Sequence, residues 1–276
     1  MAGMLYLVPT PIGNLGDISL RCRETLESAD FIAAEDTRVT LKLLNHLGIK
    51  KSLVSYYEHN KATKGDRIVD RILAGETCAL VSDAGSPAIS DPGEDLVRLC
   101  AENGVEVRAV PGCCAAVNAL AVSGLPTGRF TFEGFLTVNK KSRREHLDSL
   151  KDETRTMIFH EAPHKLRTTL EDLCAAFGPE RRIALCREIT KLHEEVRRCT
   201  LAEAIAYYEE NTPKGEYVLV VEGAAPKTGA AVTLEDGVAQ VLTLKEQGMR
   251  LKDAAKEVAE HTGLSKNELY AAALER

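Results

Sequence analysis

Apolar segments typical of strands alternate with helical patterns through the first 123 residues of this 276-residue chain. The predicted strands are the runs at 5–9, 31–35, 52–56, 77–82 and 105–111. The predicted helices lie between and after them, near 19–29, 38–47, 65–74, 92–103 and 113–123. In the fourth helix, Leu96, Leu99 and Cys100 form an apolar stripe of the kind that covers a sheet. Because a helical pattern separates each strand from the next, the sequence predicts a mainly parallel α/β sheet.

The breaker-rich segment SGLPTG at 123–128 predicts a boundary between two domains. Beyond it, aromatic and β-branched runs predict strands at 129–136, 155–162, 181–190 and 215–224. Helical patterns lie between them, near 142–151, 163–176 and 201–211. We therefore expect an N-terminal α/β domain at 1–124 and a second α/β domain with a mixed sheet at 128–225.

The stretch AAPKTGAA at 224–231 predicts a flexible connection to a helical tail. The tail, 233–276, is predicted to form three short helices in a helix-turn-helix-like domain. It carries six Lys or Arg residues against eight Asp or Glu residues, fewer cations than a sequence-specific DNA reader needs. Two interpretations stay open for it: an auxiliary contact with RNA or a partner, and an element of packing or dimerisation.

The composition argues against several classes of protein. No apolar run approaches the roughly 18 residues of a membrane span, and residues 1–5 lack the pattern of a signal peptide. The eight cysteines contain no CxxC motif, and none pairs with histidine at metal-ligand spacing. We therefore expect no metal, no membrane contact, and a reducing, cytoplasmic location. The net charge of −6 disfavours a general attraction to nucleic acid but permits a local basic patch.

Ligands of open parallel sheets bind at the carboxyl ends of the strands. Of the five predicted strand ends, three consist mainly of glycine, proline and other small residues: 9–16, 82–93 and 110–115. A single such loop only indicates a turn, but three on one edge favour a site where backbone groups approach a ligand closely. Neither GxGxxG nor GxxxxGK[ST] occurs, which disfavours a dinucleotide fold and a P-loop nucleotidase.

The motifs at these strand ends carry a family resemblance. They read, in chain order, LYLVPTPIGNLGDIS, ADFIAAEDTR, VSDAGSPAISDPG, VPGCCAAV, FEGFL and GEYVLVVEG. Together they resemble the tetrapyrrole-methylase superfamily of S-adenosylmethionine-dependent methyltransferases, over essentially the whole chain. Within it, they are similar to the subfamily that methylates the ribose 2′-hydroxyl in small-subunit ribosomal RNA. The superfamily's usual GDP motif is here Ser82-Asp83-Ala84, a departure characteristic of the RNA-modifying branch.

The resemblance implies a two-domain homodimer that binds S-adenosylmethionine in a folded conformation, in the cleft between the domains. It also implies methyl transfer to the ribose of a cytidine at the decoding centre of 16S rRNA. The cofactor-binding positions that it implies are Pro11, Gly13, Asp83, Ala84, Gly85, Ile89, Cys114, Ala115, Glu161, Ala162, Gly215, Glu216 and Tyr217.

Methyl transfer to a ribose hydroxyl calls for alignment of the reacting atoms and for help with the hydroxyl proton or the developing alkoxide. The polar candidates at the cleft edge are Glu35, Asp36, Arg38, His59, His160, Glu161, Lys191 and Glu194. Each of them could instead form a surface salt bridge or fix a loop. We favour Asp36 with Arg38, two opposite charges directly after a buried strand, and next Lys191 as a cation that follows an internal strand.

The densest basic patch follows FEGFL, where Lys140, Lys141, Arg143 and Arg144 give four cations in five positions. Such a cluster can neutralise RNA phosphates although the protein is acidic overall. The alternative is a solvated helix start, but cations are slightly unfavourable at a helix N-terminus.

Two other functions compete with RNA ribose methylation. One is methylation of a small tetrapyrrole or of a modified residue on a protein. The other is a non-catalytic RNA-binding or assembly module that has kept the fold. The small-residue loops argue against the second of these, because a chain without a ligand has little reason to keep that edge empty.

Overall fold

The computed structural model describes residues 3–59, 61–225 and 233–275 and divides into two units, 1–224 and 225–276. Each unit is described by itself. Residues 226–231 of the predicted connecting stretch lie outside the described residues.

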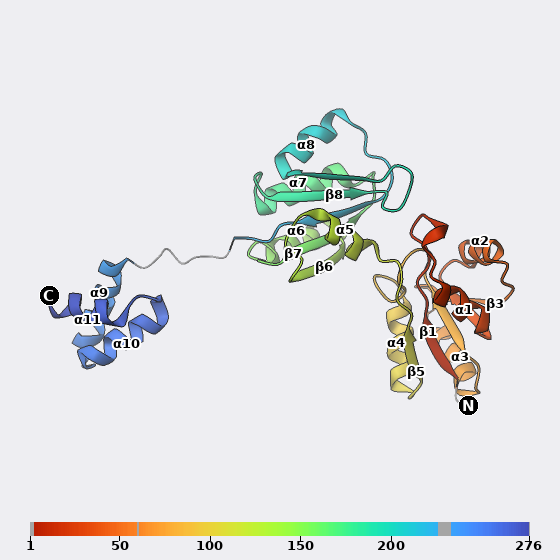
Figure 1. Ribbon diagram of the computed structural model, residues 1–276, viewed down its shortest axis with the longest axis horizontal. Coiled ribbons are helices and arrows are strands. Elements are labelled where there is room, and N and C mark those ends of the chain that lie inside the picture. Colours follow the sequence, from red (N-terminus) through yellow and green to blue (C-terminus); the bar gives the residue numbers. More distant parts are fainter. Residues whose placement is uncertain (1–2, 60, 226–232, 276) are drawn as a thin grey trace. The chain divides into compact units, whose positions relative to one another are not determined.

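The first sheet has five strands in the order β3-β2-β4-β1-β5, all parallel (Figure 1). The strands are β1 (Met4–Leu7), β2 (Phe31–Ala34), β3 (Ser52–Ser55), β4 (Cys78–Val81) and β5 (Glu106–Ala109). The helices that alternate with them are α1 (Leu20–Ser28), α2 (Thr37–Leu47), α3 (Lys61–Leu73), α4 (Gly93–Glu102) and α5 (Ala115–Ser123). The predicted parallel α/β sheet is therefore confirmed, with strands shorter than expected at most of their ends.

The central strands β2 and β4 are buried along their whole length, as their unbroken runs FIAA and CALV indicate. Successive side chains point to opposite faces, so Phe31 packs with Ile68 of α3 and Leu96 of α4 in one cluster. Ile32 belongs to the cluster on the other face, which contains Leu26 of α1 and residues of α2. Helices on both faces leave the carboxyl edge of the sheet, where all five strands end, free to carry the loops.

The second sheet has the order β6-β7-β10-β8-β9 (Figure 1). Its strands are β6 (Phe130–Phe135), β7 (Thr156–Glu161), β8 (Arg182–Arg187), β9 (Glu195–Thr200) and β10 (Tyr217–Val221). Only β6 and β7 pair in parallel, so the predicted mixed sheet is confirmed. The prediction missed β9, whose sequence EVRRCT is charged because it forms an edge strand exposed on part of its surface.

Helices α6 (Lys140–Ser149), α7 (Leu166–Phe177) and α8 (Leu201–Glu210) belong to the second sheet's half of the unit. Leu166, Leu170 and Leu173 of α7 are fully buried in the cluster that includes Leu219 of β10. Helix α5 covers the other face, where Ala119 and Leu120 pack with strand residues such as Ile158 and Val220 (Figure 1). The chain thus passes from the first sheet to the second between β5 and α5, before the SGLPTG segment.

The unit at 225–276 contains three helices among its described residues: α9 (Leu234–Glu246), α10 (Leu251–Thr262) and α11 (Lys266–Leu274). They share a small core that includes Val241, Val258 and Leu269. A Cβ atom at Gly237 would lie 2.7 Å from the terminal methyl groups of Leu264 and Leu269, so glycine lets these two leucines pack directly against α9. The three predicted tail helices are therefore present. In the part of the chain that the structure describes, no helix is long and apolar enough to cross a bilayer.

Candidate active site

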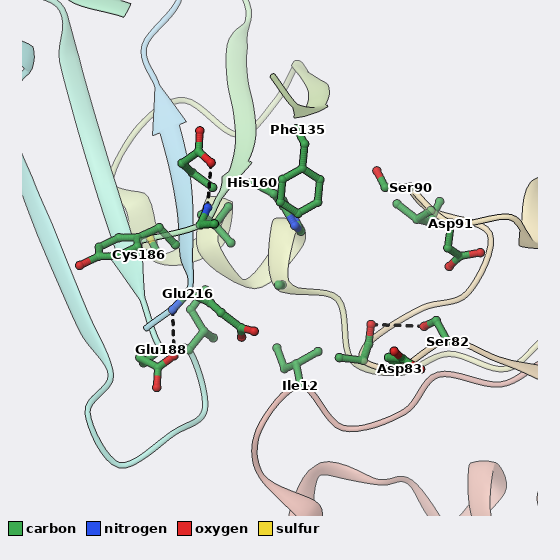
Figure 2. Close-up of a pocket in the computed structure, with 18 of the residues that line it drawn as sticks. Ile12, Ser82, Asp83, Ser90, Asp91, Phe135, His160, Cys186, Glu188 and Glu216 are labelled. Atoms are coloured by element: carbon green, nitrogen blue, oxygen red, sulfur yellow. Dashed lines mark hydrogen bonds between the residues drawn. The ribbon is translucent and has the colours of Figure 1, made fainter. Parts of the chain in front are cut away.

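A cavity of about 560 Å³ lies within the unit at 1–224, between the loops of the first sheet and one end of the second sheet (Figure 2). Ile12, Asp83 and Asp91 face it from the first sheet's loops, and His160, Glu188 and Glu216 face it from the other side. The remaining lining residues are Glu35, Ser82, Ala84, Ile89, Ser90, Ala115, Phe135, Glu161, Ala162, Pro163, Cys186, Ile189, Lys191, Tyr217 and Val218.

The three small-residue loops are tied to one another by hydrogen bonds. Thr10 and Gly85 each donate an N–H to the other's carbonyl at 3.0 Å. Ser86 Oγ donates to the carbonyl of Cys113 at 2.9 Å, which joins the third loop. Gly85 has φ +85°, and a Cβ atom there would lie 3.3 Å from Ile12, so a larger residue would be strained as well as crowded. The loops therefore form one preorganised rim, in which Gly13 and Ala84 are exposed and Thr10 and Gly85 are buried.

Asp91 holds the segment that follows this rim. Its Oδ1 accepts the backbone N–H groups of Ala88 at 3.0 Å and of Gly93 at 2.7 Å. Ala88 and Ser90 have φ of 66° and 64°, a left-handed conformation that is uncommon outside glycine and needs such support. Burial raises the pKa of the Asp91 carboxyl, and the same two N–H groups oppose that shift.

The cavity has a negative electrostatic character. Of the described residues that line it, six are Asp or Glu and one is Lys. Burial raises the pKa of Glu35, and the charges of Asp83 and Asp91 raise it further. A site of this kind favours a cationic ligand.

One cation and two carboxylates pair with one another on the side of the cavity that the second sheet contributes. Lys191 Nζ lies 2.8 Å from Glu188 Oε1 and 2.8 Å from Glu216 Oε2. The hydrogen bond from Lys191 is the main cause that lowers the pKa of Glu188. A Cβ atom at Gly13 would lie 2.4 Å from Lys191 Cγ, and one at Gly215 would lie 2.4 Å from Glu188 Cγ. Both glycines also have positive φ, so a larger residue at either position would be strained and would displace Lys191 or Glu188.

His160 is a half-buried histidine at the cavity wall. Phe132 and Phe135 flank its ring edge-on, with centroids 5.3 Å and 5.4 Å away. Its Nε2 is buried and has no hydrogen-bond partner among the described residues. Burial lowers the pKa of His160, so the ring is neutral at pH 7.

Of the cofactor positions expected from the sequence, eight line the cavity, drawn from both sheets: Asp83, Ala84, Ile89, Ala115, Glu161, Ala162, Glu216 and Tyr217. The other five are chain neighbours of lining residues: Pro11, Gly13, Gly85, Cys114 and Gly215. Sequence reasoning missed Ile12, Asp91, Cys186 and Glu188. For Asp91 a signal existed, since an aspartate two residues before the helix-opening Gly93 is suited to accept its N–H.

The favoured catalytic candidates fall in different places. Lys191 lines the cavity, whereas Asp36 and Arg38 stand outside its lining. Asp36 caps α2 and accepts hydrogen bonds from Arg38 Nε at 3.0 Å and Nη2 at 2.6 Å. These bonds lower the pKa of Asp36 to about 2. The Arg38 side chain is 88 % exposed, and the Asp36 N–H donates to Asp83 Oδ1 at 3.0 Å, which joins this pair to the rim.

The basic patch at the start of α6 is smaller than the sequence suggests. Lys140, Lys141 and Arg144 are exposed, but Arg143 is buried. Its guanidinium pairs with Asp172 and donates to Thr169 Oγ1 at 2.7 Å, both on α7. We therefore correct the prediction for Arg143, because its side chain holds two helices together and is not free to contact phosphate. Among the described residues, no group of three or more His, Cys, Asp or Glu is arranged to hold a metal ion.

We predict that Glu35→Gln raises the thermal unfolding midpoint at pH 7. The folded-state pKa of Glu35 lies above its unfolded value, so its ionised form disfavours folding at any pH above the raised pKa. The gain should vanish as the pH falls below about 4.5, where Glu35 is protonated in both states. Differential scanning calorimetry from pH 4 to 8 measures this, with Glu24→Gln on the exposed side of α1 as the control. A lower midpoint at pH 7, or a gain that does not change with pH, would contradict this assignment.

Comparison with known proteins identifies the family. The family model for tetrapyrrole (corrin/porphyrin) methylases matches residues 4–205, and that of the RsmI C-terminal HTH domain matches residues 232–276. The ribosomal RNA small subunit methyltransferase I of Synechocystis sp. is 47 % identical, with 99 % of this chain and 98 % of that protein covered. The protein of the same name from Escherichia coli O157:H7 is 45 % identical, with 99 % and 96 % covered.

Solved structures show the same fold. A diphthine synthase has a TM-score of 0.61 at 16 % identity, over 80 % of this chain and 90 % of its own. The uroporphyrin-III-C-methyltransferase of Thermus thermophilus has a TM-score of 0.56 at 23 % identity, over 80 % and 94 %. The resemblance found in the strand-end motifs is confirmed over nearly the full length of the chain. The chain belongs to the tetrapyrrole methylases and, within them, to the ribosomal RNA small subunit methyltransferase I family.

Proposed function

We propose that this chain transfers the methyl group of S-adenosylmethionine to the ribose 2′-hydroxyl of a cytidine in 16S rRNA, at the decoding centre of the small ribosomal subunit. The observation that carries the proposal is the cavity between the two sheets, with its rim of small-residue loops and its excess of carboxylates. The names of the relatives from Synechocystis and Escherichia coli support a ribosomal RNA substrate. That the methyl group goes to the ribose oxygen, and to a cytidine, rests on the family resemblance of the strand-end motifs.

The residues present fit the proposed cofactor. The cavity of about 560 Å³ is in the usual range of small-molecule sites, roughly 300–1,000 Å³. Six lining carboxylates against one lysine suit a positively charged sulfonium. The unpartnered Nε2 of His160 leaves a polar group that a ligand atom can satisfy. We propose that Asp83, Ala84, Ile89, Ala115 and Tyr217 hold the cofactor, together with the other cofactor positions expected from the sequence.

When bound, S-adenosylmethionine supplies a methyl group that its positively charged sulfur activates. The protein then has to bring the ribose oxygen into line with that methyl group and provide for the hydroxyl proton. We propose that Lys191 stabilises the negative charge that develops on the ribose oxygen, because it is the lysine that lines the cavity. We propose Asp36 as a positioning residue that holds the exposed Arg38 toward a substrate loop.

We further propose that the chain acts in the cytoplasm as a homodimer. Each subunit would have domains at 1–124, 128–225 and 233–276, with α5 of the first packed on the sheet of the second. The family resemblance supports this arrangement. Sedimentation equilibrium should give about twice the 30.1 kDa of one chain, and a mass of one chain would contradict it.

The main test uses small ribosomal subunits from cells that lack the modification. Incubation of the full chain with methyl-labelled S-adenosylmethionine should place label on the 2′-oxygen of one cytidine in 16S rRNA. Nuclease digestion and mass spectrometry of the RNA locate the label. Label on a base, on a ribosomal protein or on a tetrapyrrole would contradict the proposed substrate. If the chain binds the cofactor but labels neither RNA, ribosomal protein nor tetrapyrrole, a non-catalytic module would be favoured.

Ala84→Leu should abolish binding of S-adenosylmethionine while the chain stays folded. Ala84 is exposed in the cavity rim, so the added side chain occupies ligand space and disturbs no core. It is a better test than a change at Gly85, whose positive φ would add backbone strain. Isothermal titration calorimetry measures the affinity, and Ala101→Leu on the exposed face of α4 is the matched control. Wild-type affinity in Ala84→Leu would mean that this rim does not bind the cofactor.

Lys191→Met should lower kcat by about 10²-fold and leave cofactor affinity nearly unchanged. Methionine keeps the aliphatic contact with Gly13 but removes the charge, and Lys191→Arg should restore part of the rate. Lys61→Met is the matched control, because Lys61 also pairs with two carboxylates, Glu58 at 2.8 Å and Asp95 at 2.6 Å, away from the cavity lining. If Lys191→Met and Lys61→Met give the same kcat, the lysine has only a structural role.

A further inference from the structure

A second concave surface, the α6–α7 groove, lies outside the candidate active site. Helices α6 and α7 contact each other and enclose a cavity of about 780 Å³. The basic residues among its described lining are Lys140, Arg143, Arg144, Lys151, His164 and Lys165.

The groove has an excess of positive charge. Its two lining carboxylates are Asp148 and Asp172. Asp148 pairs with Lys151 at 2.7 Å, and Asp172 pairs with the buried Arg143. The charges that these carboxylates do not offset belong to Lys140, Arg144 and Lys165, each exposed or partly exposed.

Two of the three uncompensated cations stand at helix N-termini. Lys140 is the first residue of α6, and Lys165 is the N-cap of α7, where no side chain caps the helix. The partial positive charge of a helix N-terminus makes a cation there unfavourable. The same arrangement favours an anion, since both the helix dipole and the lysine attract it. Asn139 Oδ1 already accepts the N–H groups of Lys141 and Ser142 at the start of α6, so an anion there would interact with the lysine and the helix dipole. Two such positions in one groove suit a ligand with more than one phosphate.

The groove is preformed and adjoins the candidate active site. Arg143 donates to Thr169 Oγ1 at 2.7 Å, and Thr169 Oγ1 in turn donates to a carboxylate oxygen of Glu161. All three side chains are buried, and Glu161 lines the active-site cavity. The connection from β7 to α7 also runs directly from one site to the other: Ala162 and Pro163 line the cavity, and His164 and Lys165 line the groove.

We propose that the α6–α7 groove binds the phosphodiester backbone of the RNA substrate, next to the nucleotide that enters the active-site cavity. The inference rests on the proposed function and adds the surface that holds the RNA. It replaces the four-cation patch expected from the sequence. Arg143 is paired with Asp172 and holds α6 against α7, and Lys141 does not line the groove. The cations that we expect to contact phosphate are Lys140 and Arg144 of α6 and Lys165 at the start of α7.

The test compares two double variants of the full chain. Lys140→Ala with Arg144→Ala removes two groove cations that lie outside the active-site lining. Lys50→Ala with Lys51→Ala removes two cations just before β3, at the amino end of the first sheet and away from the loops that form the site. Fluorescence anisotropy with 16S rRNA transcribed in vitro measures affinity between 50 and 300 mM salt. Calorimetry with S-adenosylmethionine checks that the cofactor site is intact.

The groove variant should bind RNA about tenfold more weakly than wild type at roughly 0.15 M salt. The slope of log association constant against log salt concentration should become shallower by about 1.4, because each of the two lost phosphate contacts on a single strand contributes about 0.7. The control variant should match wild type in both, and both variants should keep wild-type cofactor affinity. If wild type methylates the ribose and the groove variant keeps wild-type RNA affinity and salt slope, the groove proposal fails alone. If wild type binds the cofactor but labels no RNA, the proposed function fails and the groove proposal fails with it.

Discussion

The parallel direction of the five strands of the first sheet is the constraint on which the site depends. It brings the carboxyl ends of strands from Met4 to Ala109 to a single edge, so loops that are far apart in sequence meet there. The paired N–H and carbonyl groups of Thr10 and Gly85 then lock two of these loops together. Larger side chains on this rim would break those contacts or fill the cavity, which is why the loops are so poor in side chains.

Opposite charges are separated on this protein, whose net charge is −6. The cavity between the sheets is rich in carboxylates, and the α6–α7 groove is rich in cations. On the proposed function, each site suits its own ligand: a sulfonium cofactor in the first and an RNA backbone in the second. A cavity rich in carboxylates would attract a positively charged sulfonium more strongly than a neutral thioether. The buried chain from Arg143 through Thr169 to Glu161 joins the two sites.

Most of the fold could be predicted because local patterns agree with it. FIAA and CALV are buried on both faces of the sheet, and an unbroken apolar run has that meaning in an α/β protein. The missed strand β9 reads EVRRCT. Its charged residues find partners at the edge of the sheet: Glu195 pairs with Arg197 at 2.8 Å, and Arg198 donates to the carbonyl of Ser123 at 3.0 Å. The packing of α5 on the second sheet could not be predicted, because its apolar residues Ala119 and Leu120 could cover either sheet equally well.

The sequence predicted the candidate site where the backbone conformation requires particular residues. It did not predict those side chains whose burial depends on contacts with residues far away in the chain. Gly13 and Gly85 stood out because small residues cluster around them, whereas Gly215 was expected only from the family resemblance. Nothing local distinguishes Arg143 from Arg144: one is buried because Asp172 and Thr169, far along the chain, lie opposite it. The same holds for His160, whose ring is partly covered by Phe132 and Phe135 of a neighbouring strand.

A crystal structure of the chain soaked with S-adenosylmethionine tests the central claim most directly. The account predicts one cofactor per chain in the cavity between the sheets, with its adenosyl group against the backbone at Ala84 and Ala115. Its sulfonium should face the carboxylates of the lining. A cavity that stays empty while the cofactor binds elsewhere on the chain would contradict the account.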